Sequence, residues 1–312
     1  MPFFSVVIPL FNKENHIYDT LTYILNQTFP DFEVIVVNDG STDNSSNIVE
    51  NFSDSRIRLF HQENQGASVA RNFGISRAQS KYIALIDADD IWYSTHLEEF
   101  YKSIQTYPNA AVFCNAYQLK LSESFTQNAS YNLQNLKEIQ LVEDYFKASM
   151  LHPLIMTSGV AFTKKDFLEV GCFKPEIISG QDIDLWIRFA LQKTIVFNPK
   201  ITACYDRTVP NSLSKKHLRK VKYEFLNSYK TEEKTNPSFK KYLDINRYSV
   251  AIQCKYYNDR EVFNLLKNEI DYSSLNKKQV ILLNTPSFLV RYLKKFHSYL
   301  IKKNIHLTTF KS

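Results

Sequence analysis

Apolar and polar positions alternate in two distinct ways along the first third of the chain. Four continuous apolar runs, rich in β-branched residues, predict buried strands at residues 4–10, 32–37, 57–60 and 82–86. Between them, apolar residues recur at helical spacing, which predicts helices at residues 15–27, 41–51 and 67–78. Strands without a polar face, each followed by a helix, are typical of a parallel sheet that is covered on both sides.

The pattern weakens in the rest of the chain. Strands are expected at residues 111–119 and 157–162 and a helix at 181–191, whereas residues 121–150 are polar and weakly patterned. From about residue 213 the chain is helical in tendency and contains none of the six glycines. We therefore expect an α/β part at 1–212 and a mainly helical part at 213–312.

Net charge divides the chain at the same place. The whole sequence carries +6, but residues 1–212 hold 17 basic and 24 acidic residues, a net charge of −7. Residues 213–312 hold 21 basic and 8 acidic residues, a net charge of +13. A basic segment favours an anionic partner such as a membrane surface, a nucleic acid or an acidic glycan. No nucleic-acid-binding motif accompanies this charge, so a nucleic-acid partner is not expected.

The cysteines and the first residues indicate the cytoplasm. Cys114, Cys172, Cys204 and Cys254 form no CxxC pair, as expected of reduced and mostly buried thiols. Residues 1–10 lack the basic start and the small-residue cleavage site of a signal peptide. No apolar run approaches the roughly 18–20 residues of a transmembrane helix. We expect a cytoplasmic protein and leave open a peripheral attachment to the inner face of the cytoplasmic membrane.

Polar residues follow the expected strands, at the edge where parallel sheets bind ligands. The strongest feature is Asp87-Ala88-Asp89, which follows the strand at 82–86. Two carboxylates two residues apart project to the same side of an extended backbone, and a cation is needed to offset their repulsion. Hard oxygen ligands favour Mg²⁺ or Mn²⁺, and such a metal typically keeps positions open for phosphate oxygens. A solvated acidic turn is the alternative interpretation.

Five segments in fixed order extend this observation: SVVIPLFNKE, VVNDGSTDNS, NQGASVARNFGI, IALIDADD and SGQDIDLWIR. Together they closely resemble the family 2 glycosyltransferases over residues 3–212, about two thirds of the chain. The resemblance implies an α/β protein of the GT-A fold, with a Rossmann-like, mostly parallel sheet flanked by helices. Residues 1–212 would be the catalytic domain, and residues 213–312 a basic, mainly helical C-terminal extension.

The resemblance also implies where the nucleotide of the donor binds. Pro9, Phe11 and Asp39 would hold the uridine of a sugar nucleotide. Chemistry agrees, because an aromatic or backbone wall packs on a pyrimidine and a carboxylate accepts its imide N–H. Asp39 also suits a purely structural role, as a turn residue before Gly40.

The diphosphate and its metal are assigned by the same resemblance. Gly66 and Arg71 match the family's segment before the metal strand. Arg71 would neutralise the diphosphate or pair with Asp87, and a structural ion pair is the alternative. Asp87 would lie near the ribose, and Asp89 would bind the Mn²⁺ or Mg²⁺ that bridges the phosphates. Asp90 is expected to cap the following helix.

Residues 180–186 resemble the family's Glu-Asp motif near the acceptor. By that match Asp182 is the general base, which takes the proton of the acceptor hydroxyl. Gln181 and Trp186 are candidates for the acceptor side, and a core position is the alternative for Trp186. Asp184 is expected to be a helix N-terminal carboxylate favoured by the helix dipole.

Two positions depart from the family pattern. Gln181 stands where a glutamate is usual, which leaves hydrogen bonding but removes a charge. Val209 lies where many members carry a histidine that assists the metal or the diphosphate. Either His217 substitutes for it, or the metal has fewer protein ligands and more water. The seven histidines otherwise form no cluster that predicts a zinc site.

Residues 287–303 show a second kind of amphipathic pattern. One helical face carries apolar side chains, while lysines and an arginine fall largely on the other face or at the end. The apolar side chains are Phe288, Leu289, Tyr292, Leu293, Phe296, Tyr299 and Leu300. This pattern is typical of an interfacial helix on anionic lipid. The alternative is a surface helix that packs on the catalytic domain and leaves its lysines in solvent.

The sequence thus predicts a metal-dependent inverting glycosyltransferase. Its expected donor is a nucleoside-diphosphate sugar, with UDP as the favoured nucleotide. Its expected acceptor is a glycan or lipid-linked molecule in the synthesis of a cell-surface polysaccharide or lipopolysaccharide. Gln181 and Val209 leave open a catalytically weak or inactive relative that acts as a binding or scaffold module. A nucleotidyltransferase or a dinucleotide dehydrogenase is disfavoured, because no glycine-rich loop follows any expected strand.

Overall fold

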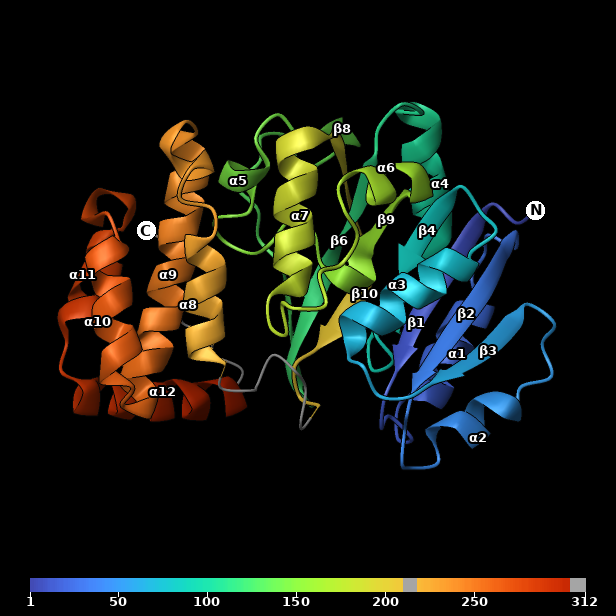
Figure 1. Ribbon diagram of the computed structural model, residues 1–312, viewed down its shortest axis with the longest axis horizontal. Helices are drawn as coiled ribbons and strands as arrows, with labels where there is room; N and C mark the ends of the chain where they lie inside the picture. Colours follow the sequence, from blue (N-terminus) through green and yellow to red (C-terminus); the bar gives the residue numbers. More distant parts are fainter. Residues whose placement is uncertain (210–217, 304–312) are drawn as a thin grey trace.

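The computed structural model, which describes residues 1–209 and 218–303, places ten strands of these residues in one sheet (Figure 1). Their spatial order is β3-β2-β1-β4-β9-β6-β10-β5, with β7 paired to β6 and β8 paired to β10. The strands are β1 (Phe4–Leu10), β2 (Phe32–Asp39), β3 (Ile57–Gln62), β4 (Tyr82–Leu85), β5 (Ile91–Trp92), β6 (Val112–Ser122), β7 (Phe125–Asn128), β8 (Gln140–Leu141), β9 (Val160–Thr163) and β10 (Ile195–Asp206).

The four N-terminal strands follow the sequence pattern closely. β1 pairs in parallel with β2 and β4, and β2 pairs in parallel with β3. Every residue of β2 and β4 is buried, which explains why residues 34–37 and 82–85 are all apolar. The carboxyl ends of these strands therefore meet at one edge of the sheet.

In the second half of the sheet, the strand directions differ from the parallel arrangement predicted for the first strands. The segment expected as a strand at 157–162 begins with a 3₁₀ turn, Thr157–Gly159, and then forms β9. β9 runs antiparallel to both β4 and β6, so the sheet is mixed. The long strand β10, which the sequence analysis did not identify, runs parallel to β6 and antiparallel to β5.

Seven helices of the described N-terminal part connect and cover these strands. They are α1 (Ile17–Leu25), α2 (Ser45–Glu50), α3 (Ala67–Arg77), α4 (His96–Thr106), α5 (Tyr145–Ala148), α6 (Lys164–Glu169) and α7 (Gln181–Gln192). α3 packs on β1 and β2, and α4 packs on β6 and β10. Figure 1 shows α3 and α7 in front of the sheet. A Cβ atom at Gly74 of α3 would lie 2.6 Å from Cγ1 of Val7, so glycine is what allows α3 this close to the sheet.

Five helices make up the described C-terminal part, as the composition predicted. They are α8 (Arg219–Asn227), α9 (Pro237–Tyr257), α10 (Arg260–Glu269), α11 (Lys277–Asn284) and α12 (Ser287–Lys302). α9 contacts the other four, and it also reaches the first part through Phe239, whose ring centroid lies 4.4 Å from that of Phe146 in α5. Where a domain boundary falls, at 212/213 or elsewhere, stays a prediction.

The cysteines are unpaired thiols, as expected. Cys114, Cys204 and Cys254 are buried, and Cys172 is half-buried. In the ranges that the structure describes, no helix is both long and apolar enough to cross a membrane.

Candidate active site

A cavity of about 450 Å³ lies at the carboxyl ends of the parallel strands. Its volume is within the range of small-molecule sites. Nine predicted site residues line it: Pro9, Phe11, Asp39, Gly66, Arg71, Asp87, Asp89, Gln181 and Asp182. They come from segments up to about 170 residues apart in sequence, so the fold gathers them at one place.

The loops after β1 and β2 bind each other at the mouth of this cavity. Asn12 has φ of 51° and accepts a hydrogen bond from the backbone N–H of Thr42 at 2.8 Å. The backbone N–H of Lys13 donates to Oγ of Ser45 at 2.7 Å. These contacts explain why α2 begins at Ser45, whereas the sequence predicted a helix from residue 41. Phe11, which is 44% exposed, projects from the tied loop as an open apolar wall.

Asp39 is held by the loop that follows β3. Its carboxylate accepts hydrogen bonds from the side-chain amide of Gln62 at 2.7 Å and from the backbone N–H groups of Gln65 and Gly66 at 2.9 Å each. The carboxylate is 3% exposed, but the residue still lines the cavity. Asp39 therefore positions the loop that leads to α3, a structural role different from the turn alternative.

Arg71 brings a buried cation to the cavity. One guanidinium nitrogen, Nη2, donates to Oδ1 of Asp87 at 2.5 Å, which is the ion pair predicted as one of two possibilities. Arg71 is 4% exposed, and within the described ranges its Nε and Nη1 atoms have no hydrogen-bond acceptor. Buried donors without acceptors are costly, so the site is arranged for a further acceptor.

Asp89 faces a second cation. Nζ of Lys13 lies 2.5 Å from Oδ2 of Asp89, and the two side chains are 20% and 14% exposed. The described residues contain no group of three or more His, Cys, Asp or Glu side chains arranged around a metal. The donor set that Asp89 offers thus fits a hard cation that takes its other ligands from phosphate and water, not an all-protein cage.

Asp90 does not cap a helix, contrary to the sequence prediction. Its carboxyl accepts hydrogen bonds from Oγ of Ser158 at 2.5 Å and from the backbone N–H of Asp206 at 3.2 Å. Thr95 occupies the position before α4 instead. Asp90 is 2% exposed and ties the loop between β4 and β5 to the end of β10. The apolar segment after it starts a short strand rather than a helix, which is why the capping prediction was wrong.

Asp182 is the second residue of α7, whose N-cap is Gly180 with φ of 89°. Burial raises the pKa of Asp182 above its ordinary value, and the positive charge of Arg71 opposes that rise. Lys222 of α8 also lines the cavity. Burial lowers the pKa of Lys222, and the charge of Asp182 opposes the fall. A carboxylate with a raised pKa is a stronger base once it is ionised.

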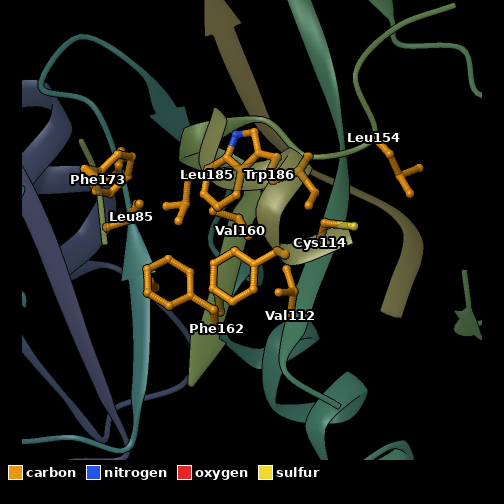
Figure 2. Packing of buried hydrophobic residues seen from close by; sticks show 14 of the residues in the cluster. Leu85, Val112, Cys114, Leu154, Val160, Phe162, Phe173, Leu185 and Trp186 are labelled. Carbon is orange, nitrogen blue, oxygen red and sulfur yellow. The ribbon is translucent and has the colours of Figure 1, made fainter. Parts of the chain in front are cut away.

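Trp186 is not an acceptor-side residue, so that prediction is corrected. Its side chain is 2% exposed and does not line the cavity. It packs in the core against Phe162, Phe173 and Phe189, with ring centroids 6.3–6.4 Å away. Figure 2 shows the indole among the buried apolar side chains. Trp186 lies about one helical turn after Asp182 in α7, and its side chain is buried in the protein core.

Asp184 serves the fold rather than the cavity. It is 1% exposed and accepts hydrogen bonds from Nη2 of Arg188 at 2.5 Å and from the Tyr229 hydroxyl at 2.6 Å. It does lie in the first turn of α7, as the sequence predicted. The ion pair with Arg188 and the hydrogen bond from Tyr229, which follows α8, are additions that only the folded structure shows.

Sequence reasoning missed seven further lining residues with polar side chains: Lys13, Asn64, Thr157, Ser179, Tyr205, Asp206 and Lys222. Lys13 lies in residues 5–14, one of the segments that carry the family resemblance, so its charge was a usable signal. Tyr205 and Asp206 end β10, whose alternating residues were overlooked. Val209 is buried, and His217, its suggested substitute, lies outside the described residues.

Comparison with known families and proteins gives a consistent picture. The family described as glycosyl transferase family 2 matches residues 5–161. An uncharacterized glycosyltransferase of Rickettsia felis is 32% identical over 197 residues, which are 61% of this chain and 31% of the relative. Glycosyltransferase GlyG of Streptococcus pneumoniae is 40% identical over 122 residues, 38% of this chain and 40% of the relative. The chain thus matches less than half the length of these curated relatives.

Solved structures resemble the chain over nearly its whole length. S. aureus TarS 1-349 in complex with UDP-GlcNAc has a TM-score of 0.70 at 16% identity, covering 96% of this chain and 91% of that one. The mannosyltransferase PcManGT from Pyrobaculum calidifontis, in complex with GDP-Man and Mn²⁺, has a TM-score of 0.56 at 17% identity, covering 97% and 87%. At such identities the likeness concerns the fold, and it confirms the predicted α/β GT-A architecture with a helical C-terminal region.

Proposed function

This chain belongs to glycosyl transferase family 2, and we propose that it is a metal-dependent, inverting glycosyltransferase. It would move a sugar from a nucleoside-diphosphate sugar, a UDP-sugar in the first instance, to a hydroxyl of an acceptor. The observation that carries the proposal is the single cavity in which Asp39, Arg71, Asp87, Asp89 and Asp182 meet. The sugar nucleotides bound by TarS and PcManGT support the donor class.

The nucleotide would enter along the loops after β1, β2 and β3. Phe11 offers an exposed ring for the base, and Pro9 lies on the same wall. The carboxylate of Asp39 already accepts three hydrogen bonds, from Gln62, Gln65 and Gly66. The proposed hydrogen bond from the imide N–H of uracil would be accepted by the same two carboxylate oxygens. A carboxylate has room for about four donors, so both roles are compatible.

The diphosphate would bind between two cations of the chain. Arg71 has buried Nε and Nη1 atoms that lack acceptors among the described residues, and phosphate oxygens are suitable acceptors. Lys13 also lines the cavity and brings a second positive charge, which is paired with Asp89. Asp87, whose Oδ1 receives Arg71, would lie next to the ribose.

Asp89 would hold the metal, Mn²⁺ or Mg²⁺. Its oxygen donors and the absence of a three-residue ligand group in the described ranges fit an ion held mainly by the nucleotide and water. When bound, such an ion would act as a Lewis acid that stabilises the charge of the departing diphosphate. The Mn²⁺ in the PcManGT complex supports this choice.

Asp182 would be the general base. Its carboxylate takes the proton of the acceptor hydroxyl while the hydroxyl oxygen forms a bond to the anomeric carbon. The bond between that carbon and the diphosphate oxygen breaks, and the diphosphate leaves with the electron pair. Attack opposite the leaving group inverts the anomeric centre and needs no covalent intermediate. Gln181, which is 8% exposed at the cavity, is a candidate to bind the acceptor by hydrogen bonds.

The acceptor is proposed to be a glycan or a lipid-linked molecule used in the synthesis of a cell-surface polysaccharide or lipopolysaccharide. Lys222 brings a positive charge to the cavity from outside the family match, which ends at residue 161. That charge favours an acceptor with an anionic group near the hydroxyl.

Nucleotide release tests the proposed function. The purified chain is incubated with a panel of UDP-, GDP-, CDP- and dTDP-sugars, with Mn²⁺, Mg²⁺ or EDTA, and with or without candidate acceptors. We expect nucleoside diphosphate to form with one donor, in a manner that depends on metal and acceptor. Donor binding without any release would instead favour the scaffold alternative. Release of pyrophosphate from a nucleoside triphosphate and a sugar phosphate would favour a nucleotidyltransferase.

A further inference from the structure

Helix α12 presents its apolar face outward. Six of its apolar side chains are between 41% and 69% exposed, and they recur every three to four residues along one side. They are Phe288, Leu289, Tyr292, Leu293, Phe296 and Tyr299, called here the α12 apolar face. This excludes the simple surface-helix alternative, in which the same side chains would pack on the catalytic part. A contiguous exposed apolar stripe of this kind marks an interaction site.

Contacts on the opposite side fix how α12 is turned. Val290 is 2% exposed, and α12 contacts α9 and β6. Nζ of Lys294 lies 4.1 Å from the ring centroid of Tyr256 and 5.6 Å from that of Tyr257, both at the end of α9. Rotating the helix to bury its apolar face would break these contacts. The outward orientation is therefore built into the packing of the C-terminal bundle.

We propose that the α12 apolar face docks the protein on an anionic phospholipid surface. The helix has 16 residues and is about 24 Å long at 1.5 Å per residue, and it would lie in the plane of the interface. Four of its six exposed apolar side chains are Phe or Tyr, which prefer the boundary between headgroups and acyl chains. Insertion removes these rings from water without any helix that spans the bilayer.

Charge selects lipid over a second copy of this chain. Arg291 and Lys295 lie on α12 beside the apolar face, and residues 213–312 carry a net charge of +13. Two copies joined through this face would bring these charges together, which opposes dimerisation. An anionic bilayer surface complements them and attracts juxtamembrane Lys and Arg residues.

The docked helix would also place the cavity close to the membrane. α12 contacts β6, and the backbone N–H of Arg207, just after β10, donates to the carbonyl of Lys120 in β6 at 3.0 Å. Arg207 directly follows Asp206, which lines the cavity. In Figure 1, α12 runs across the lower end of α9, at the same end of the molecule as the start of α8. Membrane binding itself does not depend on the proposed activity, and the two can fail separately.

Vesicle flotation tests this proposal on the full chain. The wild type is mixed with vesicles of phosphatidylcholine alone or of phosphatidylcholine with 30% phosphatidylglycerol, roughly the anionic content that makes such surfaces attractive to Lys and Arg. The variant Phe288→Ser/Tyr292→Ser/Phe296→Ser removes the centre of the apolar face, and Arg291→Glu/Lys295→Glu reverses the charge. Leu168→Ser, at a 58% exposed leucine of α6, is the matched control. Circular dichroism and analytical ultracentrifugation check folding and association, because exposed positions should not alter the fold.

We expect the wild type and Leu168→Ser to float with the anionic vesicles and not with the neutral ones. The triple serine variant should lose at least about tenfold in partitioning, since three ring side chains no longer leave water. The charge-reversal variant should lose binding in a salt-dependent manner. Unchanged partitioning of a folded triple variant would overturn the proposal. So would a wild-type dimer that becomes monomeric in the triple variant without any binding to vesicles, because the face would then serve a second copy.

Discussion

The ammonium nitrogen of Lys13 lies 2.5 Å from Oδ2 of Asp89, so a lysine from the loop after β1 neutralises the carboxylate proposed to bind metal. Both side chains are largely shielded, at 20% and 14% exposure. A divalent ion that binds Asp89 must share or replace this contact. Lys13 would then turn to the diphosphate, where its charge is again useful. In this proposal the ion pair would link metal binding to donor binding.

Replacing Lys13 by methionine should strengthen metal binding in the absence of nucleotide. The competing cation is lost, while the apolar stem keeps its packing. Partly shielded ion pairs are worth up to about 1 kcal/mol, so we expect Mn²⁺ affinity to rise about two- to fivefold. Electron paramagnetic resonance of free Mn²⁺ measures this without any turnover. Equal or weaker Mn²⁺ binding by Lys13→Met would show that the lysine does not compete for Asp89.

Replacing Asp89 by alanine should abolish the metal-dependent part of donor binding. The variant removes the carboxylate through which the chain would hold the ion, while Arg71 and Lys13 remain. Isothermal titration of the protein with the sugar nucleotide, once with Mn²⁺ and once with EDTA, gives the metal-dependent and the metal-independent parts of donor binding. Asp19→Ala, an exposed position on α1, is the control and should bind as the wild type does. Metal-dependent binding that survives in Asp89→Ala would place the ion elsewhere.

Replacing Asp39 by alanine should weaken both the fold and donor binding. Three donors, from Gln62, Gln65 and Gly66, would lose their acceptor. Unsatisfied donors of this kind cost on the order of 1–3 kcal/mol, so urea unfolding should show a loss of about 2 kcal/mol. Asp39→Asn keeps one acceptor oxygen and should lose less. A fully stable Asp39→Ala would contradict the positioning role of this carboxylate.

Replacing Asp184 by alanine should destabilise the protein without any specific effect on the donor. Arg188 is 8% exposed and would be left with a buried, uncompensated charge, which typically costs about 3–5 kcal/mol. Its hydrogen bonds to the carbonyl groups of Val170 and Cys172 would remain. Thermal unfolding measures the loss of stability. Titration with the sugar nucleotide, at a temperature below the unfolding transition, measures the donor affinity. If Asp184→Ala were as stable as the wild type but bound the donor more weakly, Asp184 would have a role in donor binding and not in stability.

Buried strands and the residues that follow them could be read from the sequence. β1, β2 and β4 lie deep in the sheet, so their residues are apolar on both faces and their ends are marked by polar residues. Polar residues were expected at the edge where parallel sheets bind ligands, and Asp39 and Asp87 line one cavity at that edge.

Strand direction and tertiary contacts could not be read in the same way. β9 is as apolar as its neighbours, and nothing in its residues records that it runs antiparallel. Trp186 follows the helical spacing of a core residue, and the family match had offered it an acceptor role that its burial excludes. Lys222 reaches the cavity because α8 packs beside the start of α7, where Phe225 lies 3.5 Å from the Cβ position of Gly180. That contact is set by the fold alone.

Asp182 is proposed to take the proton of an acceptor while the other cavity residues hold a sugar nucleotide. Titration and single-turnover transfer by Asp182→Asn, on the donor identified by nucleotide release, test it most directly. We predict donor affinity within about twofold of the wild type and a loss of transfer of at least about a hundredfold, the low end of what a general base contributes.

The same measurement includes the pH dependence of the wild type. Burial raises the pKa of Asp182, so the carboxylate becomes ionised, and transfer should begin, at a higher pH than for an ordinary aspartate. This acidic limb should be absent from any residual transfer by Asp182→Asn. Transfer by Asp182→Asn at the wild-type rate, with the same acidic limb, would contradict the account.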